Sequence, residues 1–161
     1  MNILYKTRTY LVGHMQYASG RDWREYVEEE LVPLNITIFN PYKKPFVKDV
    51  NEDEGAREKV QNDMKKGFFN DVAERMKLIR SYDLNLVDRS DFIVAHLLPE
   101  VASWGSAEEL VTAVRMKKPI FISMEGGKAQ TPLWIMGMLP HNYIYDSVDE
   151  ILDMIRQIND G

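Results

Sequence analysis

The chain of 161 residues contains no cysteine. Disulfide bonds, zinc–thiolate centres and cysteine nucleophiles are therefore excluded. Histidine is also scarce: His14, His96 and His141 are the only three, and they lie far apart, without the spacing of metal ligands. We interpret all three as loop or surface residues and expect no metal site.

The sequence also lacks long apolar runs and an excess of positive charge. No run reaches the ~20 apolar residues of a membrane-spanning helix, and the N-terminus, MNILYKTRTYLVG, has no signal-peptide pattern. The net charge of −5 argues against a nucleic-acid-binding surface, which needs a basic stripe. We therefore expect a soluble, cytoplasmic protein that binds neither membranes nor nucleic acid, while a local basic pocket for one phosphate stays open.

The overall composition is typical of a globular domain. Hydrophobic residues make up 45% of the chain and charged residues 28%. The length fits a single domain, residues 1–161, with a substantial core. Short apolar runs predict four buried strands and a candidate fifth, at residues 9–12, 35–39, 92–98, 119–123 and 142–145.

Amphipathic segments separate these strands. Apolar residues recur at helical spacing within residues 21–31, 60–79 (with a break expected near Gly67) and 148–158. Residues 83–90 resemble a further short helix. The charged, turn-rich segment 43–59 is interpreted as a long loop, either a functional lid or a plain solvated excursion.

Strands that alternate with helices specify a parallel sheet covered on both faces. We expect an α/β fold, a flavodoxin-like (Rossmann-like) doubly wound sandwich with a mainly parallel five-stranded sheet. Ligands of such sheets bind outside the carboxyl ends of the strands, at the topological switch point. The loops after Gly13, after Asn40 and from Pro99 to Gly105 would meet there.

Two adjacent glutamates, Glu108 and Glu109, begin a predicted helix on that rim. Ser106 and Glu109 fit a capping box, S-x-x-E, in which Glu109 would only reach back to its own backbone. Alternatively, one of the glutamates faces the rim, since successive helical residues point about 100° apart. The helix dipole would keep a first-turn carboxylate ionised, as a nucleophile at an anomeric carbon must be.

A second acid, Asp83, precedes the strand that leads into this loop. Glycosidic cleavage requires one carboxylate to attack and another group to protonate the leaving atom, and Asp83 and Glu109 could form that pair. Gly105 would let a sugar approach the backbone, and Ser106 could donate a hydrogen bond. We interpret Asp88 and Asp91 as turn or cap residues.

These segments, taken in order, resemble the nucleoside 2-deoxyribosyltransferase family. The matching residues are Tyr10-Leu11-Val12-Gly13, then Asp83-Leu84 and Ser90-Asp91-Phe92-Ile93-Val94-Ala95, then Gly105-Ser106-Ala107-Glu108-Glu109-Leu110 through Ala113. The resemblance spans about residues 8–123. It implies a flavodoxin-like domain that cleaves the N-glycosidic bond of nucleosides or nucleotides without a cofactor and assembles as a homo-oligomer, a dimer or larger.

The resemblance also assigns roles to residues. Glu109, rather than Glu108, matches the nucleophile because Leu110 follows it, Asp83 matches the site aspartate, and Tyr10 matches the tyrosine that holds the nucleophile or sugar. Together with the rim residues above, the expected substrate-binding set is Gly13, His14, Met15, Asn40, Pro41, Ser103, Gly105 and Ser106.

One position departs from the base-exchanging members of that family. Six residues before the nucleophile they carry an aspartate that binds the 5′ side of the sugar, whereas this chain has Ser103. The arrangement resembles the branch that hydrolyses nucleoside 5′-monophosphates: Ser103 and Ser106 could cradle a phosphate with helix N-terminal N–H groups. Ser103 could equally be an ordinary loop serine. The asparagine that transferases lend to a neighbouring subunit has no clear match, although Gln130 and Thr131 lie nearby in sequence.

The expected function is cleavage of the N-glycosidic bond of a (deoxy)nucleoside or its 5′-monophosphate through a covalent ribosyl-glutamate intermediate, with transfer to another base or to water. The alternative is a non-catalytic nucleotide-binding module of the same fold. A phosphoryl-transfer enzyme is disfavoured because no G-x-x-x-x-G-K-[ST] loop is present, and Gly126-Gly127-Lys128 only echoes one. The apolar segment 131–145 is either buried or a subunit interface.

Overall fold

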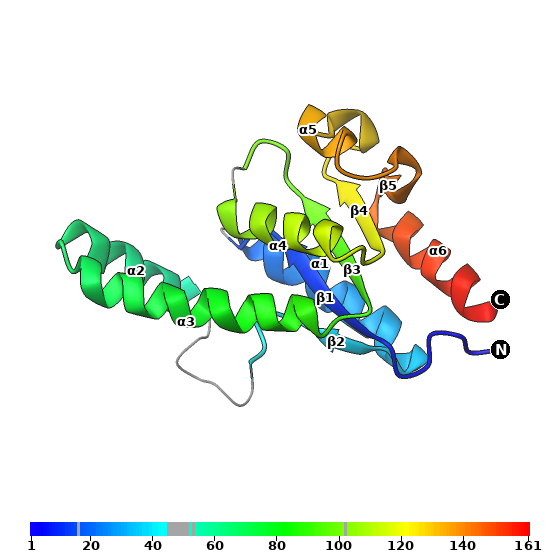
Figure 1. Cartoon of the computed structure of the whole chain (residues 1–161), viewed down its shortest axis with the longest axis horizontal. Helices are drawn as coiled ribbons and strands as arrows, with labels where there is room; N and C mark the ends of the chain where they lie inside the picture. Colours follow the sequence, from blue (N-terminus) through cyan, green and yellow to red (C-terminus); the bar gives the residue numbers. More distant parts are fainter. Residues whose placement is uncertain (16, 45–51, 53, 102) are drawn as a thin grey trace.

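Figure 1 shows the computed structural model of the chain, which describes residues 1–15, 17–44, 52, 54–101 and 103–161. A single sheet is formed by β1 (Arg8–Gly13), β2 (Thr37–Phe39), β3 (Phe92–Leu97), β4 (Ile120–Met124) and β5 (Ile144–Tyr145). Every pairing is parallel, and the strand order is β2-β1-β3-β4-β5. The expected flavodoxin-like α/β fold is therefore confirmed, with its switch point between β1 and β3.

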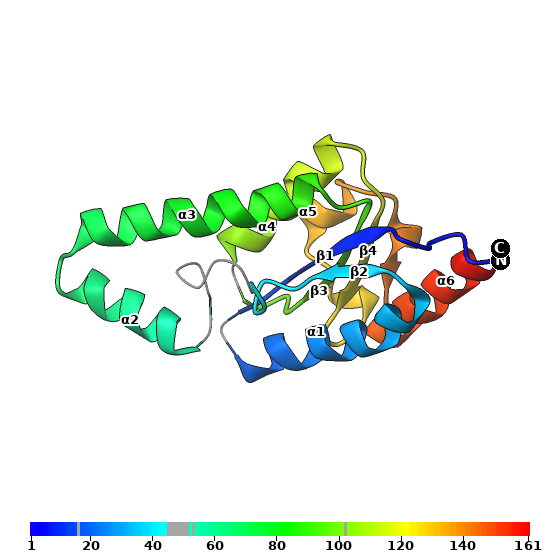
Figure 2. The ribbon, with the colours of Figure 1, turned by 90° about the horizontal axis from the view of Figure 1, so that it is seen from below.

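Helices cover both faces of this sheet. They are α1 (Ala18–Leu31), α2 (Glu54–Lys65), α3 (Phe69–Asp88), α4 (Trp104–Arg115), α5 (Leu133–Met136) and α6 (Val148–Asp160). Figure 2 shows α1 and α6 on one face and α3, α4 and α5 on the other. None of the described helices combines the length and apolarity needed to cross a bilayer.

Strand alternation divides the core into two layers. Tyr10 and Val12 of β1 pack with residues of α3 and α4, whereas Leu11 packs with α1 and α6. All three are essentially inaccessible to solvent. Because β1 is buried on both faces, its side chains are fixed by packing, and the two residues at its carboxyl end, Val12 and Gly13, are placed rigidly at the switch point.

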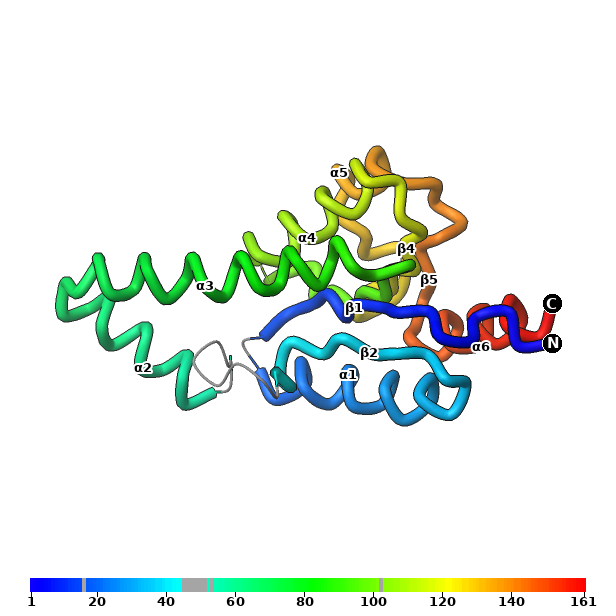
Figure 3. The backbone as a smooth tube through the Cα atoms, turned by 60° about the horizontal axis from the view of Figure 1, so that its bottom comes forward, coloured from blue at the N-terminus to red at the C-terminus, as the bar shows by residue number. Residues whose placement is uncertain are grey.

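Helices α2 and α3 form a hairpin that projects beyond the sheet (Figures 1 and 3). Gly67, between them, has a φ of 80°, so the expected break near Gly67 is confirmed. The interpretation of residues 43–59 as a long loop was wrong for its last part, because α2 already begins at Glu54; residues 45–51 and 53 lie outside the described part of the chain. The charged composition that suggested a loop belongs to a helix with no buried residue.

Other element boundaries also differ from expectation. Residues 83–88 are not a separate short helix but the last part of the 20-residue α3. The fifth strand is shorter than residues 142–145, since His141–Tyr143 form a 3-10 turn and only Ile144–Tyr145 pair with β4. The helix expected at 148–158 is confirmed as α6, whose N-cap Ser147 accepts a hydrogen bond from the backbone N–H of Glu150.

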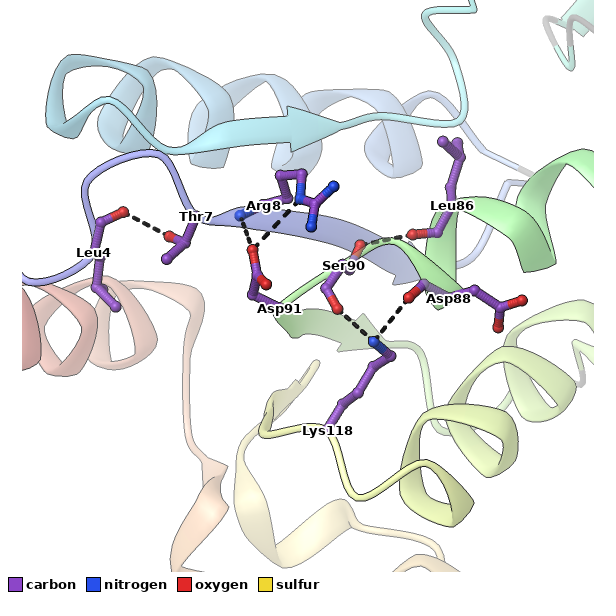
Figure 4. Close-up of polar contacts among 8 residues, drawn as sticks. All are labelled: Leu4, Thr7, Arg8, Leu86, Asp88, Ser90, Asp91 and Lys118. Carbon is purple, nitrogen blue, oxygen red and sulfur yellow. Dashed lines mark hydrogen bonds and ion pairs between the residues drawn. The ribbon is translucent and has the colours of Figure 1, made fainter.

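Asp88 and Asp91 lie at the amino end of the sheet, away from the strand ends that bind ligands (Figure 4). A carboxylate oxygen of Asp91 accepts a hydrogen bond of 2.8 Å from the backbone N–H of Arg8, and the carbonyl of Asp88 accepts one from Lys118. The turn or cap role expected for these residues agrees with this position. This position excludes Asp88 and Asp91 from a site at the carboxyl ends of the strands.

Candidate active site

Gly13 closes β1 at a point where no side chain fits. A Cβ atom there would lie 2.5 Å from the carbonyl oxygen of His96 and 2.9 Å from the ring of Trp23. The carbonyl of Gly13 accepts hydrogen bonds from the hydroxyl of Ser106 (3.0 Å) and from the guanidinium of Arg24 (2.9 Å). Gly13 therefore joins the end of β1 to α1, β3 and α4.

We expect Gly13→Ala to destabilise the protein by about 2 kcal/mol, since a methyl group would push β1 away from a backbone oxygen that cannot yield. Urea unfolding followed by circular dichroism would measure the loss. Gly105→Ala is the matched control: among the described residues, only a carboxylate oxygen of Glu109, at 3.8 Å, comes near its Cβ position. The control should keep its stability, and an equal loss in both variants would contradict this role for Gly13.

Arg24 is a buried cation that the sequence reasoning missed. It is 1% exposed, and its guanidinium donates hydrogen bonds to the carbonyls of Leu11, Gly13, His14 and Gly20, at 2.8–3.2 Å. The available signal was its place within the apolar stripe of α1, between Trp23 and Val27. The bonds order the chain just after β1, and the positive charge lies on the wall of the candidate site.

Ser103 is the N-cap of α4, and its hydroxyl accepts a hydrogen bond from the backbone N–H of Ser106. The proposed capping box from Ser106 to Glu109 was therefore wrong, because the helix begins at Trp104, three residues earlier than that box requires. Glu109 lies in the second turn and is not used as a cap. The hydroxyl of Ser103 also donates to that of Ser106 at 3.1 Å, which links it to Gly13.

Glu108 and Glu109 point in different directions, as their helical positions predict. Glu108 forms an exposed ion pair with Arg80 of α3, and this hydrogen bond lowers the pKa of Glu108. Glu109 is half-buried and turns inward, where it accepts a hydrogen bond from the hydroxyl of Tyr10. Tyr10 is itself buried, and burial followed by the charge of Glu109 raises its pKa, so it remains a donor.

The environment of Glu109 favours a proton. Burial, followed by the charge of Asp83, raises the pKa of Glu109 to about 8, against the opposing effects of Tyr10 and Arg24. The expectation that the helix N-terminus keeps this carboxylate ionised was wrong, because the second turn lies beyond the unpaired N–H groups that generate most of that effect.

Asp83 is 6% exposed and comes from the sheet-facing part of α3. Burial, followed by the charge of Glu52, raises the pKa of Asp83 to about 8. The ammonium of Lys44 acts in the opposite direction from 3.0 Å away. Asp83 is thus a carboxyl group that can carry a proton at neutral pH, as a general acid must.

A cavity of about 310 Å³ brings most of the expected site residues together at the carboxyl ends of β1 and β3. Its lining includes nine of them: Tyr10, Gly13, Met15, Pro41, Asp83, Ser103, Gly105, Ser106 and Glu109. It also includes five that the sequence reasoning did not name: Arg24, Glu52, Arg57, Met76 and Trp104. A nucleoside-sized ligand fits a cavity of this volume.

His14 and Asn40 do not line this cavity. His14 is buried, with its Nε2 2.9 Å from the hydroxyl of Ser19, and burial followed by the charge of Arg24 lowers its pKa to about 4. Asn40 is also buried; its side-chain oxygen accepts from the backbone N–H of Tyr42, and its amide donates to Glu28. These contacts shape the loops after β1 and β2, so the two residues expected to touch the ligand are structural here.

Within the described part of the chain, no group of three His, Asp or Glu side chains is arranged to hold a metal ion. The cavity instead contains three carboxyl groups, from Glu52, Asp83 and Glu109, and two guanidinium groups, from Arg24 and Arg57. This donor set suits acid–base and nucleophilic chemistry on a polar organic molecule.

No protein-family model and no curated protein matches the sequence. Several solved structures are similar, among them the following two. One is a 2-deoxyribosyltransferase from Bacillus psychrosaccharolyticus, with 18% identity, a TM-score of 0.58, and coverage of 83% of this chain and 82% of that one. The other is a conserved protein from Enterococcus faecalis V583, with 17% identity, a TM-score of 0.58, and coverage of 95% and 99%. The resemblance to the nucleoside 2-deoxyribosyltransferase family is therefore confirmed at the level of the fold, which this chain shares over most of its length.

Proposed function

We propose that the protein cleaves the N-glycosidic bond of a nucleoside or nucleoside 5′-monophosphate, with Glu109 as the nucleophile and Asp83 as the acid. One observation carries the proposal: Glu109 and Asp83 line the same cavity at the switch point. Glu109 is half-buried and accepts a hydrogen bond from Tyr10, and the surroundings of Asp83 favour the protonated form of its carboxyl group. The 2-deoxyribosyltransferase of the same fold supports the class of reaction.

The reaction would proceed in two displacements. An oxygen of Glu109 attacks C1′ while the C1′–N bond breaks, and Asp83, directly or through water, gives its proton to the leaving base. Water, or a second base, then attacks C1′ of the ribosyl-glutamate ester and returns Glu109 as a carboxylate. Two inversions give net retention at C1′.

Tyr10 positions the nucleophile in this scheme. Its hydroxyl holds one oxygen of Glu109, which leaves the other oxygen for C1′. The guanidinium of Arg24 lies on the same wall and favours the ionised form of Glu109. Since Glu109 must be ionised and Asp83 protonated, base release should rise with pH as Glu109 loses its proton and fall again as Asp83 does, with a maximum near pH 8.

The test is an assay of free base released from a panel of nucleosides and their 5′-monophosphates, with and without an acceptor base. Release without an acceptor identifies a hydrolase, and base exchange identifies a transferase. Mass spectrometry of the quenched protein should detect a ribosyl adduct on Glu109. Ligand binding without turnover across the whole panel would replace the proposal by its alternative, a nucleotide-binding module.

Ser103 favours a 5′-monophosphate as the substrate. Its hydroxyl and that of Ser106 line the cavity at the N-terminus of α4, where unpaired N–H groups bind anions. Arg57 adds a positive charge on the cavity wall. A serine can donate a hydrogen bond to a phosphate, whereas a carboxylate at this position would repel it.

We expect Ser103→Asp to lower the ratio of kcat/KM for a 5′-monophosphate to that for the nucleoside by at least about 10-fold, because it places a negative charge beside the phosphate. Aspartate caps helices as well as serine does, so α4 should remain stable. Ser103→Asn is the matched control, a good cap without charge, and should shift the ratio far less. An unchanged ratio in Ser103→Asp would place the 5′ side elsewhere.

A homo-oligomer is also proposed, from apolar side chains beside the site. Trp104 is 90% exposed, and Leu133 and Trp134 of α5 are 89% and 82% exposed. Large apolar side chains that are this exposed to water favour burial against another chain. Light scattering coupled to size-exclusion chromatography would give the molar mass, and a monomer at micromolar concentration would refute this part of the proposal.

A further inference from the structure

Lys44 is a fully buried lysine that contacts two carboxyl groups of the site. Its side chain has no exposed surface, and its ammonium lies 2.7 Å from Glu52 and 3.0 Å from Asp83. It also lies 5.6 Å from the centre of the Tyr82 ring. Lysine is rarely buried unless it is paired, so its location beside the proposed acid requires an explanation.

The turn after β2 fixes the backbone that carries Lys44. The backbone N–H of Lys43 donates to the carbonyl of Asn40, and the hydroxyl of Tyr42 donates to the carbonyl of Met15 in the loop after β1. Asn40 therefore has a structural role in this turn. The turn delivers the ammonium to the side of Asp83 from a segment that the sequence reasoning treated as a loop.

The charges in this cluster do not balance if every carboxyl group is ionised. One ammonium faces Glu52 and Asp83, while Glu109 approaches from α4. The shorter contact is with Glu52, so the positive charge of Lys44 mainly neutralises the carboxylate of Glu52. A second ionised carboxylate in this buried space would lack a full counter-charge, and the least costly solution is a proton on Asp83.

We propose that Glu52 and Lys44 are positioning residues for Asp83: Glu52 holds the acid proton on Asp83 until the base departs, and Lys44 holds Glu52 in place and stabilises the pair of carboxylates that remains. Glu52, paired with Lys44, presents its carboxylate to Asp83 and accepts a hydrogen bond from it. The inference rests on the proposed function for its chemistry. It adds to that function two residues that act on the substrate through Asp83.

The proton balance of each step follows from this arrangement. When the C1′–N bond breaks, its electron pair leaves with the base, and the proton of Asp83 moves to that base. Asp83 and Glu52 are then both ionised, and the ammonium of Lys44, between them, stabilises the extra charge. The attacking water later bonds to C1′ and gives one proton back to Asp83, which restores the starting state.

The groups facing Asp83 define what a titration would report. They are Lys44 and Glu52 from the segment after β2, Tyr10 from β1, Glu109 from α4, and Arg24 and Arg57 on the cavity wall. Removing Glu52 or Lys44 changes the charge next to Asp83 in opposite senses. A purely structural role for the pair would not produce opposite shifts.

The experiment is a titration of ¹³C-labelled aspartate carboxyl groups by NMR in the resting protein, with Asp83 assigned from the Asp83→Asn spectrum. We expect Glu52→Gln to lower the midpoint of Asp83 by at least about one pH unit, because the negative charge beside Asp83 is removed while the ammonium of Lys44 stays. Lys44→Met should raise it. Lys43→Met, which removes an exposed lysine paired with Glu28, is the matched control and should leave it unchanged.

Enzyme kinetics provide the second readout. The alkaline limb of kcat/KM against pH should move down in Glu52→Gln and up in Lys44→Met, and Lys44→Arg should restore most of the parent profile. If Lys44→Met does not fold, Glu52→Gln alone still decides the direction. The inference is overturned if the Asp83 midpoints of Glu52→Gln and Lys44→Met stay within about 0.3 pH unit of the parent value, or if both move in the same direction. If the parent protein cleaves nothing, the proposed function fails, while the NMR titration still decides the role of the pair.

Discussion

Glu109→Gln is expected to lower the rate of base release by at least about 10³-fold, because glutamine cannot form the ester with C1′. The substitution preserves side-chain volume and leaves an oxygen to accept the Tyr10 hydrogen bond. Initial rates on the best substrate of the panel would measure the loss. Glu108→Gln is the matched control, one residue away but in an exposed ion pair with Arg80, and should stay within about threefold of the parent. Equal activity of parent and Glu109→Gln would remove the nucleophile from the scheme.

The same variant should be more stable than the parent at alkaline pH. The folded-state pKa of Glu109 is raised to about 8, above its unfolded value, so the parent loses stability as pH rises from about 4 to about 8 and the carboxyl must ionise inside the protein. Glutamine has no such cost. We expect Glu109→Gln to gain about 1–3 kcal/mol at pH 8.5 relative to the parent, and much less at pH 5. Thermal unfolding at the two pH values would reveal the difference, and a constant gap between parent and variant would contradict it.

The second large effect is expected for the acid. Asp83→Asn should slow release of an ordinary base by about 10²–10⁴-fold, since the base must then depart without a proton. A nucleoside whose base already carries a positive charge, such as an N7-methylated purine, needs no such help and should lose far less. The control is Asp88→Asn, five residues along the chain at the amino end of the sheet, where Lys118 contacts the backbone carbonyl of Asp88, which the substitution keeps.

The comparison of the two substrates separates acid catalysis from general damage. If Asp83→Asn lost the same factor on both, the residue would be needed for folding or binding rather than for proton transfer. If it lost nothing on either, the acid would be elsewhere in the cavity. The ratio of kcat/KM values for the two substrates is the quantity to report.

Periodicity predicted the sheet because burial dominates this fold. The runs at β1, β3 and β4 are mostly apolar and almost entirely buried, since both faces of those strands are covered. The order of these strands and the intervening helices leaves few topologies. The start of α2 could not be found in this way: no residue of that helix is buried, so an apolar stripe has no reason to be there. The N-cap of α4 was misplaced because Ser103 and Ser106 are both good caps, and the loop geometry decides between them.

The residues of the candidate site were likewise predicted only in part. Glu109 was identified from local spacing because a helix turns its successive residues by a fixed angle, which separates it from Glu108. Arg24 and Lys44 were missed because each owes its role to contacts outside its own element: Arg24 with carbonyls at the end of β1 and just after it, and Lys44 with Asp83 about forty residues away. The local sequence pattern does not predict such contacts. The net charge of the cavity is known only when the folded structure shows which residues line it.

The projecting α2–α3 hairpin has a consequence for protein engineering. It supplies Arg57 and Met76 to the cavity wall, whereas the proposed nucleophile Glu109 comes from α4 and the proposed acid Asp83 from the sheet-facing end of α3, far from the hairpin tip. Since α2 buries no side chain, its sequence is free of the constraints that packing imposes on the strands. The hairpin tip could therefore be exchanged or randomised as a module to select new base preferences, while the machinery on the sheet is inherited unchanged.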